Sequence, residues 1–255
     1  MTSTPTRASA ETYVDTVRRL SSAQKTAARG APAYSVYVNR RVGRYLAAGA
    51  FRLGLTPNNV TAISAGFTFC AIGLLTIGEP SWGFGIVVWL LLAVGYAFDS
   101  ADGQVARLRG GGSPSGEWLD HVVDSIKIST LHLAVLIMMF RHFPLESSAW
   151  LLVPIGFAAV AAVSFFAMIL NDLLKAKHAP TIAPPAAPRT LLRSLLGVPT
   201  DYGVLCLAFV LLGAPLAFFG LYALLFVANT LYLALALGKW FRDMTALGRV
   251  ESARP

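Results

Sequence analysis

The chain has 255 residues, of which 55% are hydrophobic and only 13% are charged. Soluble domains carry about 25% charged residues, so this composition excludes an ordinary water-soluble domain and indicates a chain that lies mostly in lipid. The net charge of +8 would fit a nucleic-acid partner, but the distribution of the basic residues, described below, excludes nucleic acid and indicates membrane topology. The two cysteines lie in apolar runs without metal-ligand spacing, and we interpret them as small buried hydrophobes.

The N-terminal part divides into a polar tail and an amphipathic segment. Residues 1–31 are rich in Ser, Thr, Ala and basic residues, and they lack the short apolar core of a secretory signal peptide. We interpret them as a mobile cytoplasmic tail with room for a short helix around residues 10–28. Residues 32–55 mix aromatic and leucine side chains with arginines, which predicts an amphipathic helix lying in the membrane interface.

Six long apolar runs follow, and a helix that crosses a bilayer needs about 20 such residues. The runs are 58–77, 82–108, 117–140, 149–174, 202–219 and 221–241. The last two are separated only weakly, around residues 213–220, whereas the fourth and fifth are joined by the proline-rich residues 178–200, which cannot form a continuous helix. The sequence therefore predicts an all-α, polytopic membrane bundle of about six transmembrane helices over residues 56–243, with a cytoplasmic C-terminal tail over 244–255.

The basic residues fall almost entirely on one side of this predicted bundle. With the N-terminus inside, 19 of the 21 Lys and Arg residues lie on the cytoplasmic side, whereas Arg141 lies on the opposite side and Lys127 within a helix. Cytoplasmic loops of membrane proteins carry such an excess of basic residues. The pattern predicts a multi-pass protein of the cell membrane with both termini in the cytoplasm and an affinity for anionic lipid.

Four aspartates lie near the cytoplasmic ends of the second and third predicted spans. Asp99 and Asp102 are three residues apart, and Asp120 and Asp124 are four apart, so each pair shares one face of a helix. The glycine-rich residues 110–116 predict a short turn, which makes the two helices antiparallel neighbours and brings the four carboxylates to one depth. Carboxylates within membrane helices are costly and usually functional.

Four like charges at close range require a counter-charge, and Arg107 and Lys127 are too few to supply it. The sequence therefore predicts a divalent metal site, in which oxygen-only ligands favour Mg²⁺, Mn²⁺ or Ca²⁺ over Zn²⁺. Two ions are the usual device for displacement at phosphorus. Gly103 and Ala106 allow a ligand to approach the helix closely, and Arg107 can hold a phosphate, so we expect a substrate that bears a diphosphate.

The aspartates belong to a longer pattern, which reads Asp99-x2-Asp102-Gly103-x2-Ala106-Arg107-x8-Gly116-x3-Asp120-x3-Asp124. This pattern resembles the signature of the CDP-alcohol phosphatidyltransferase family at every fixed position. Residues 57–61, Pro-Asn-Asn-Val-Thr, also resemble the entry to the first span in that family. The interfacial helix and the six spans fit as well, whereas the first 30 residues and the C-terminal half carry only general resemblance.

The resemblance implies a homodimeric membrane enzyme that displaces CMP from a CDP-linked donor, with an alcohol as the nucleophile and with Mg²⁺ or Mn²⁺, two ions in all, as cofactor. It implies metal binding by Asp99, Asp102 and Asp120, and a general-base role for Asp124, which could also contact a metal. The residues that it places against the nucleotide are Gly103, Ala106, Arg107, Asn58 and Thr61.

Two further side chains are candidates for binding the acceptor, and each has a second interpretation. Lys127 could bind an acceptor phosphate or only balance charge; it is the only basic residue inside a predicted span, so few charges are available there for a phosphorylated acceptor. Glu117 could contact the acceptor, or it could stabilise the first turn of its helix.

Three functions remain open at this point. We expect phospholipid biosynthesis from CDP-diacylglycerol and a small polar alcohol. The alternative within the family is transfer of a choline- or ethanolamine-type head group from its CDP-linked form to diacylglycerol. A divalent-cation transporter is the alternative outside the family, and it is disfavoured because the acidic residues cluster at one end of two helices instead of following the membrane depth.

Overall fold

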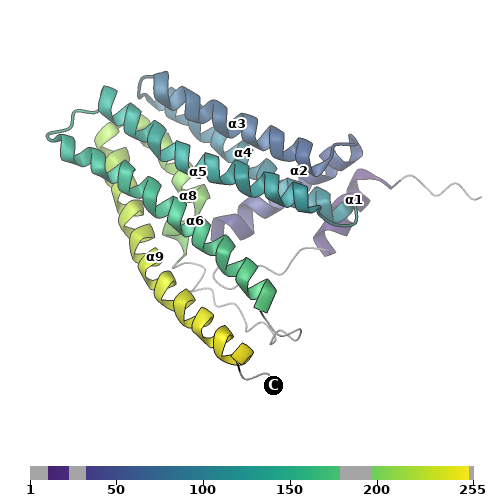
Figure 1. Cartoon of the computed structure of the whole chain (residues 1–255). Helices are drawn as coiled ribbons and strands as arrows, with labels where there is room; N and C mark the ends of the chain where they lie inside the picture. Colours follow the sequence, from purple (N-terminus) through teal and green to yellow (C-terminus); the bar gives the residue numbers. More distant parts are fainter. Residues whose placement is uncertain (1–10, 23–32, 179–196, 253–255) are drawn as a thin grey trace, which may run out of the picture.

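The computed structural model describes residues 11–22, 33–178 and 197–252, and all regular elements within these ranges are helical (Figure 1). The elements before the long helices are α1 (Tyr13–Ser22), η1 (Ser35–Asn39) and α2 (Arg40–Arg52). The long helices are α3 (Pro57–Ile77), α4 (Trp82–Leu108), α5 (Pro114–His142), α6 (Leu152–His178) and α9 (Pro215–Ser252). The short elements are η2 (Ser148–Leu151), η3 (Val198–Thr200), α8 (Tyr202–Ala208) and η4 (Phe209–Gly213).

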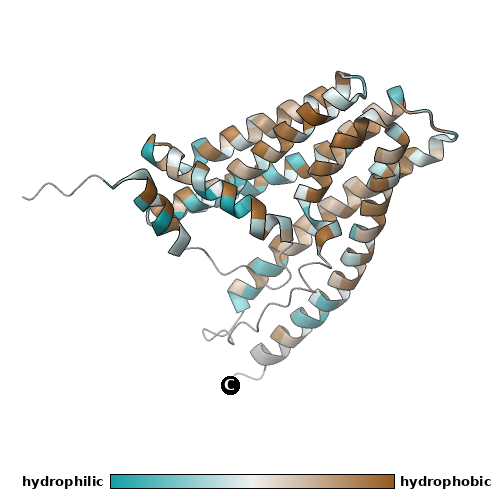
Figure 2. Ribbon diagram, turned by 180° about the vertical axis from the view of Figure 1, so that it is seen from behind, coloured by the Kyte–Doolittle hydropathy of each residue, from teal (hydrophilic) through white to brown (hydrophobic). Residues whose placement is uncertain are grey.

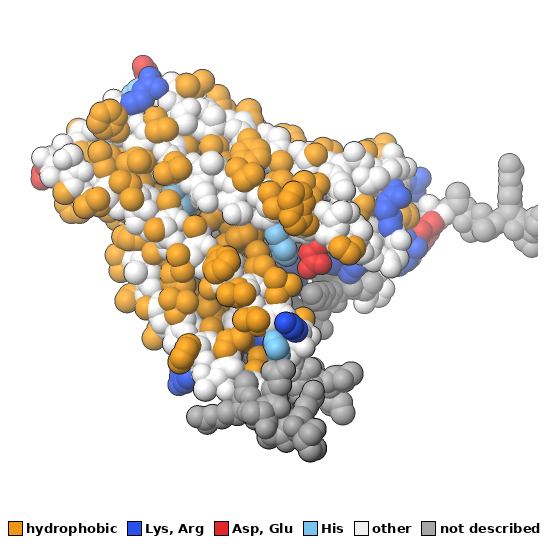
Figure 3. All heavy atoms as spheres, in the orientation of Figure 1, with side chains coloured by type: hydrophobic (Ala, Val, Ile, Leu, Met, Phe, Trp, Pro, Cys, Tyr) orange, Lys and Arg blue, Asp and Glu red, His pale blue; other side chains and the backbone are white. Residues whose placement is uncertain are grey.

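Within the described part of the chain, five helical stretches are long and apolar enough to cross a membrane. They are Pro57–Ile77, Trp82–Leu108, Pro114–His142, Ser148–His178 and Pro215–Leu247. Hydrophobic residues follow most of the length of these helices in Figure 2, and their side chains are spread over the face seen in Figure 3, where most Lys and Arg lie towards the edges. The prediction of a polytopic bundle of membrane helices is confirmed.

The predicted fifth span, residues 202–219, is wrong in its extent. α8 and η4 together cover only Tyr202–Gly213, which is shorter than a usual span. The helical path then breaks at Ala214, with φ −129° and ψ 80°, and Pro215 begins α9. A residue that precedes proline is biased away from the helical conformation, and this local rule separates two helices that hydropathy alone left joined.

The segment α8–η4 nevertheless covers much of the depth of the bundle, because it runs antiparallel to the first half of α4. The ring of Tyr202 lies 5.0 Å from the ring of Tyr96, centroid to centroid. At the other end, Gly213 lies directly against the indole of Trp82, at the start of α4. Between these points the backbone of η4 approaches Gly85 so closely that a side chain there would collide with it. The segment α8–η4 is therefore a short apolar helical stretch packed along α4, not a helix of full spanning length.

The predicted tail over residues 1–31 is not uniformly mobile, because α1 packs on α2. Thr16 and Leu20, four residues apart, face inward, and Leu20 is buried in a small core that α1 shares with α2, α3 and α4. The hydroxyl of Tyr13 donates a hydrogen bond to the carbonyl oxygen of Tyr45 at 3.0 Å. Residues 1–10 and 23–31 of the predicted tail, and most of the predicted proline-rich connection, lie outside the described residues.

The amphipathic segment and the C-terminal tail also acquire definite structure. The helix predicted over residues 32–55 is present as η1 and α2, and its small residues Gly43 and Ala47 are buried where α2 packs on α4. Its position at a membrane interface stays a prediction. The predicted C-terminal tail, 244–255, is helical through Ser252, because α9 continues without a break beyond the apolar region.

Two groups of helices position the site. α3 packs on both α4 and α5, and α6 packs between α5 and α9 (Figure 1). The main core lies among α3, α4, α5, α8, η4 and α9, and its largest fully buried side chains include Leu75, Leu92, Leu131, Phe209 and Tyr222. The four aspartates of the motif lie outside this core, near the C-terminal end of α4 and the N-terminal end of α5.

Candidate active site

Helix α3 begins at a strongly specified point. The hydroxyl of Thr56 accepts a hydrogen bond from the backbone N–H of Asn59 at 3.2 Å, and the side-chain oxygen of Asn59 accepts one from the N–H of Thr56 at 3.0 Å. This reciprocal capping box, with Pro57 in the first helical position, fixes where the helix starts. Asn58 and Thr61 are thereby placed in the first turns of α3, opposite the turn that joins α4 to α5.

A glycine turn joins α4 to α5. Gly110 and Gly111 have φ values of 96° and 134°, which side chains rarely adopt, so glycine is required at both positions. Ser113 caps α5 by accepting a hydrogen bond from the N–H of Gly116 at 3.1 Å, and Pro114 follows in the first turn. The predicted short turn is present and α5 returns antiparallel to α4, but both helices pack mainly on α3 and not on each other, so the predicted close pairing of the two is wrong.

Three of the four predicted metal-binding aspartates converge. One carboxylate oxygen each from Asp99, Asp120 and Asp124 lies within 4.8 Å of the other two. Asp102 is outside this group of three and is only 7% exposed. Its Oδ2 accepts a hydrogen bond from the hydroxyl of Thr61 at 2.7 Å, so a residue of α3 fixes its orientation. The structure thus brings three carboxylates to one point and holds the fourth one turn away on α4.

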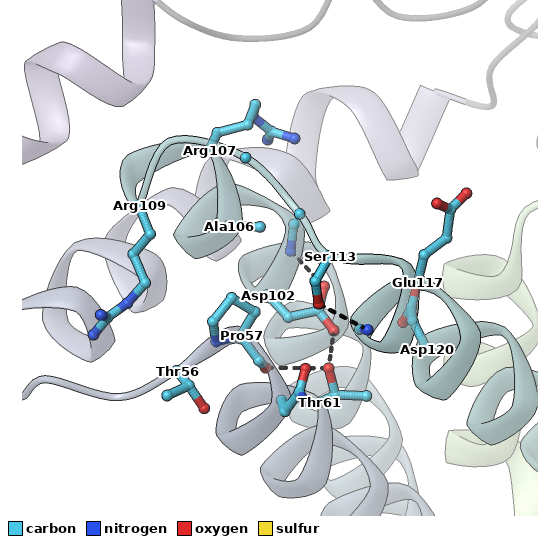
Figure 4. Close-up of a pocket in the computed structure, with 15 residues that line it drawn as sticks. Thr56, Pro57, Thr61, Asp102, Ala106, Arg107, Arg109, Ser113, Glu117 and Asp120 are labelled. Carbon is cyan, nitrogen blue, oxygen red and sulfur yellow. Dashed lines mark hydrogen bonds between the residues drawn. The ribbon is translucent and has the colours of Figure 1, made fainter.

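A cavity of about 650 Å³ opens beside these carboxylates, within the usual size range of small-molecule sites (Figure 4). The start of α3, the end of α4, the glycine turn and the start of α5 form its walls. All five residues that we predicted for nucleotide binding line it; they are Asn58, Thr61, Gly103, Ala106 and Arg107. Asp102 and Asp120 also line it, so the cavity meets the acidic cluster.

Two glycines of the motif shape this cavity in different ways. A Cβ atom on Gly103 would meet nothing closer than the Arg107 guanidinium at 3.7 Å, so it would project into the cavity and occupy it. A Cβ atom on Gly116 would lie 3.2 Å from the side-chain oxygen of Asn58, so glycine allows α3 and α5 to approach closely there. Gly103 thus keeps space for a ligand, and Gly116 closes a wall.

Arg109 also lines the cavity, and sequence reasoning missed it. One terminal nitrogen of its guanidinium donates hydrogen bonds to the carbonyl oxygens of Gly54, at 2.8 Å, and Leu55, at 2.9 Å. These contacts tie the end of α4 to the turn that precedes α3. The sequence offered one signal, an arginine two residues after Arg107 and directly before the glycines, but its acceptors are 54 and 55 residues away.

Lys127 contacts the acidic cluster from within the bundle. Its ammonium nitrogen donates hydrogen bonds to Oδ1 of Asp99 at 2.8 Å, to Oδ1 of Asp124 at 3.1 Å and to the hydroxyl of Ser64 at 3.0 Å. An ammonium group has three N–H donors, so this arrangement uses them all. Of the two interpretations of Lys127, the geometry supports charge balance.

Glu117 lies at the edge of the cavity, in the first turn of α5. Its side chain is 72% exposed, and a carboxylate oxygen lies 3.9 Å from Nε2 of His121. In Figure 4 the Glu117 carboxylate points away from Asp102 and Thr61. A negative charge here stabilises the helix N-terminus, and the same exposed position leaves Glu117 accessible to a ligand at the cavity mouth.

The chain is similar to a known family and to several known proteins. The pattern of the CDP-alcohol phosphatidyltransferase family matches residues 54–240. The phosphatidylinositol phosphate synthase of Corynebacterium glutamicum is 37% identical over 86 residues, or 33% of this chain and 36% of that protein. The phosphatidylinositol phosphate synthase of Mycobacteroides abscessus is 39% identical over 82 residues, or 32% of this chain and 35% of that protein. Each match spans about a third of the relative's length.

A solved structure shares the fold over a longer range. The crystal structure of Mycobacterium tuberculosis phosphatidylinositol phosphate synthase in complex with manganese and citrate covers 77% of this chain and 87% of that chain, with a TM-score of 0.54 and 19% sequence identity. At this identity the likeness establishes the arrangement of the helices alone. The family pattern, in contrast, covers most of the sequence and includes every residue of the acidic motif. The chain therefore belongs to the CDP-alcohol phosphatidyltransferase family and is a multi-pass membrane protein.

Proposed function

We propose that this chain is a metal-dependent phosphotransferase of phospholipid biosynthesis, which displaces CMP from CDP-diacylglycerol with the hydroxyl of a small polar alcohol. The observation that carries this proposal is the convergence of Asp99, Asp120 and Asp124, with one oxygen each within 4.8 Å, beside a cavity lined by the other motif residues. The names of the partial relatives, phosphatidylinositol phosphate synthases, support a lipid donor and a polar acceptor.

The donor set fits a hard divalent cation. Three carboxylates offer oxygen ligands at one point, and Asp102 adds a fourth nearby, which favours Mg²⁺ or Mn²⁺. The solved relative contains manganese. Bound by Asp99, Asp102, Asp120 and Asp124, two such ions would offset the charge of the diphosphate and make CMP a better leaving group.

The cavity residues bind and orient the donor in this proposal. Gly103 and Ala106 let the diphosphate approach the backbone of α4, because neither presents a bulky side chain to the cavity. Arg107 binds phosphate oxygens from the rim. Asn58 lies at the cytidine end, and Thr61 acts by orienting Asp102 through their 2.7 Å hydrogen bond.

Asp124 is the general base. It accepts the proton of the acceptor hydroxyl while the hydroxyl oxygen bonds to the phosphorus that carries diacylglycerol, and the bond from that phosphorus to the bridging oxygen breaks as CMP leaves. Lys127 donates to Oδ1 of Asp124, so Oδ2 is the oxygen available for the proton. Glu117 stands at the cavity mouth, where it could contact the incoming alcohol.

The protein lies in the cell membrane with the site and both termini on the cytoplasmic side. The basic residues favour this orientation, and counting α8–η4 as a sixth crossing gives the even number that it requires. Within it, α2 lies in the interface, residues 56–243 form the catalytic domain, and the acyl chains of the donor stay in the bilayer. The active form is a homodimer, as the family resemblance implies.

The test is CMP release by the purified chain in detergent with Mg²⁺ or Mn²⁺. CDP-diacylglycerol is supplied with a panel of alcohols that includes inositol, inositol phosphate, glycerol phosphate and serine. Release that depends on one acceptor and disappears in Asp124→Asn would support the proposal and identify the substrate. Release only from CDP-choline or CDP-ethanolamine with diacylglycerol would replace it with the head-group reaction, and no release in either arrangement would overturn it.

A further inference from the structure

Lys127 places a positive charge inside the bundle, against the acidic cluster. Its side chain is 8% exposed, whereas the side chains of Asp99 and Asp124 are 25% and 24% exposed. The ammonium group therefore approaches the two carboxylates from their buried side. The open side of the cluster, where Asp102 and Asp120 line the cavity, is left to the ligand.

Three helices fix the position of this ammonium group. Ser64 of α3 accepts a hydrogen bond from Lys127, and its own hydroxyl donates to the carbonyl oxygen of Gly95 in α4 at 2.9 Å. The helices are in close contact at this level, because a Cβ atom on Gly95 would lie only 2.4 Å from the hydroxyl oxygen of Thr68. With Asp99 on α4 and Asp124 on α5, the lysine is held at a defined point.

The contacts of Lys127 also leave room for a metal on the same carboxylates. The lysine uses only Oδ1 of Asp99 and Oδ1 of Asp124. Each carboxylate has a second oxygen, and an ionised carboxylate accepts several bonds. One carboxylate can therefore bind the ammonium group on its buried side and a cation on its open side.

We propose that Lys127 is a built-in counter-ion, a positioning residue that orients Asp99 and Asp124 and keeps the cluster folded when no metal is bound. Four carboxylates lie close together in and beside the cluster, and mutual repulsion of such groups is strong where water is scarce. The fixed charge of Lys127 offsets part of this repulsion at all times. This inference rests on the proposed function, because it requires that the cluster binds metal.

The proposal has a thermodynamic consequence. A fixed cation next to a metal site stabilises the metal-free protein and repels the incoming metal ion, so it weakens metal binding. A ligand that binds only the folded state stabilises it by an amount that grows with the logarithm of its affinity, so the same charge reduces the stability that metal adds. Removing the charge must therefore make the protein less stable without metal and more dependent on it.

The experiment measures the Tm of the purified full chain in detergent, with EDTA and with saturating Mn²⁺, together with the Kd for Mn²⁺. Lys127→Met removes the charge and keeps most of the length of the side chain. We expect a lower Tm in EDTA, a larger rise in Tm with Mn²⁺ than in the unaltered protein, and a Kd about tenfold tighter. Lys127→Arg keeps the charge and should retain a rise in Tm close to that of the unaltered protein.

The outcomes separate the two proposals. If Mn²⁺ does not raise the Tm of the unaltered protein, the proposed metal site itself is wrong. If Mn²⁺ raises that Tm, but Lys127→Met gains no more than the unaltered protein, the counter-ion role is overturned and the metal site stands. Activity is not needed for either conclusion.

A second variant covers the case in which Lys127→Met does not fold in EDTA. The double variant Asp99→Asn with Lys127→Met removes one charge of each sign, so it should regain a folded, metal-free state. Failure of the double variant to fold would overturn the proposal, because charge balance would then not decide whether the cluster is stable.

Discussion

The two groups of helices are held together by different interactions. In the α3–α4–α5 group, polar contacts cross between helices, as in Thr61 with Asp102 and Lys127 with Asp99. The second group is formed by α6, α8 and α9, where α9 packs on the other two. Aromatic packing dominates there, and the ring of Tyr222 contacts the rings of Phe157 and Phe218 at centroid distances of 5.1 and 5.6 Å. The first group holds buried charged side chains at the candidate site. The second group is held together mainly by apolar and aromatic side chains and supports the first.

The two groups also differ in how much of their apolar helices is buried inside the protein. The most apolar windows of α3 and α5 are each 39% buried inside the protein, whereas that of α6 is only 11% buried. α6 therefore leaves most of its apolar surface uncovered by the rest of the chain. Substitutions in the first group should change activity or metal dependence, and substitutions in the core of the second should change stability.

The largest expected effect is on activity, at Asp124. Asp124→Asn removes the proposed base while keeping the shape of the side chain, and general-base catalysis contributes about 10²–10⁴-fold to a rate. We expect kcat for CMP release to fall by this factor. Asp172→Asn is the matched control, because Asp172 is an exposed residue near the end of α6 and should leave the rate unchanged. Equal loss in both variants would contradict the assignment.

The largest effect on stability is expected at Tyr222. Its side chain is fully buried, and its hydroxyl lies 2.6 Å from Nδ1 of His132. Tyr222→Ala should destabilise the fold by about 3–5 kcal/mol, as for other large aromatic truncations. Tyr222→Phe removes only the hydrogen bond and should cost about 0.6–1.7 kcal/mol. Thermal unfolding in detergent measures both effects. If Tyr222→Ala changed the KM for CDP-diacylglycerol without lowering the stability, the assignment of Tyr222 to a purely structural role would be wrong.

A matched pair of glycines on α4 sharpens the comparison within the first group. Gly103→Ala adds a methyl group to the cavity, so we expect a higher KM for the CDP-linked donor and an unchanged or higher Tm, because Gly to Ala in a helix gains up to about 1 kcal/mol. Gly95→Ala adds the same group against Thr68 and should cost about 1–3 kcal/mol from overpacking. KM and Tm measured on both variants would show whether the two positions differ as expected.

A smaller effect is expected at Asp201, where the scaffold meets the N-terminal segment. Its carboxylate accepts hydrogen bonds from the backbone N–H of Ser35 at 2.9 Å and from that of Gly203 at 3.0 Å. Asp201→Ala removes the cap of α8 and should cost about 0.5–2 kcal/mol. Asp201→Asn keeps one acceptor oxygen and should lose less. An unchanged Tm in Asp201→Ala would mean that this contact does not stabilise the fold.

The sequence by itself determined the class of fold and the identity of the acidic motif. Apolar runs of about 20 residues predict spans because the bilayer sets their length. The spacing of Asp99, Asp102, Asp120 and Asp124 predicts shared helix faces because helix geometry is regular. The glycines of residues 110–116 predict a tight turn because few residues other than glycine adopt positive φ. A tight turn reverses the chain, so the next helix runs antiparallel to the one before it.

The tertiary structure decided what depends on contacts between distant residues. Lys127 had two interpretations until its three acceptors on α3, α4 and α5 were visible. The role of Arg109 depends on two backbone carbonyl oxygens more than fifty residues away. Every residue has a carbonyl group, so the sequence does not indicate which ones accept these hydrogen bonds. The docking of α1 on α2 and of the short α8–η4 segment on α4 likewise depends on which surfaces are free to pack. Local rules thus set the helices and the motif, and packing between helices decided which side chains meet.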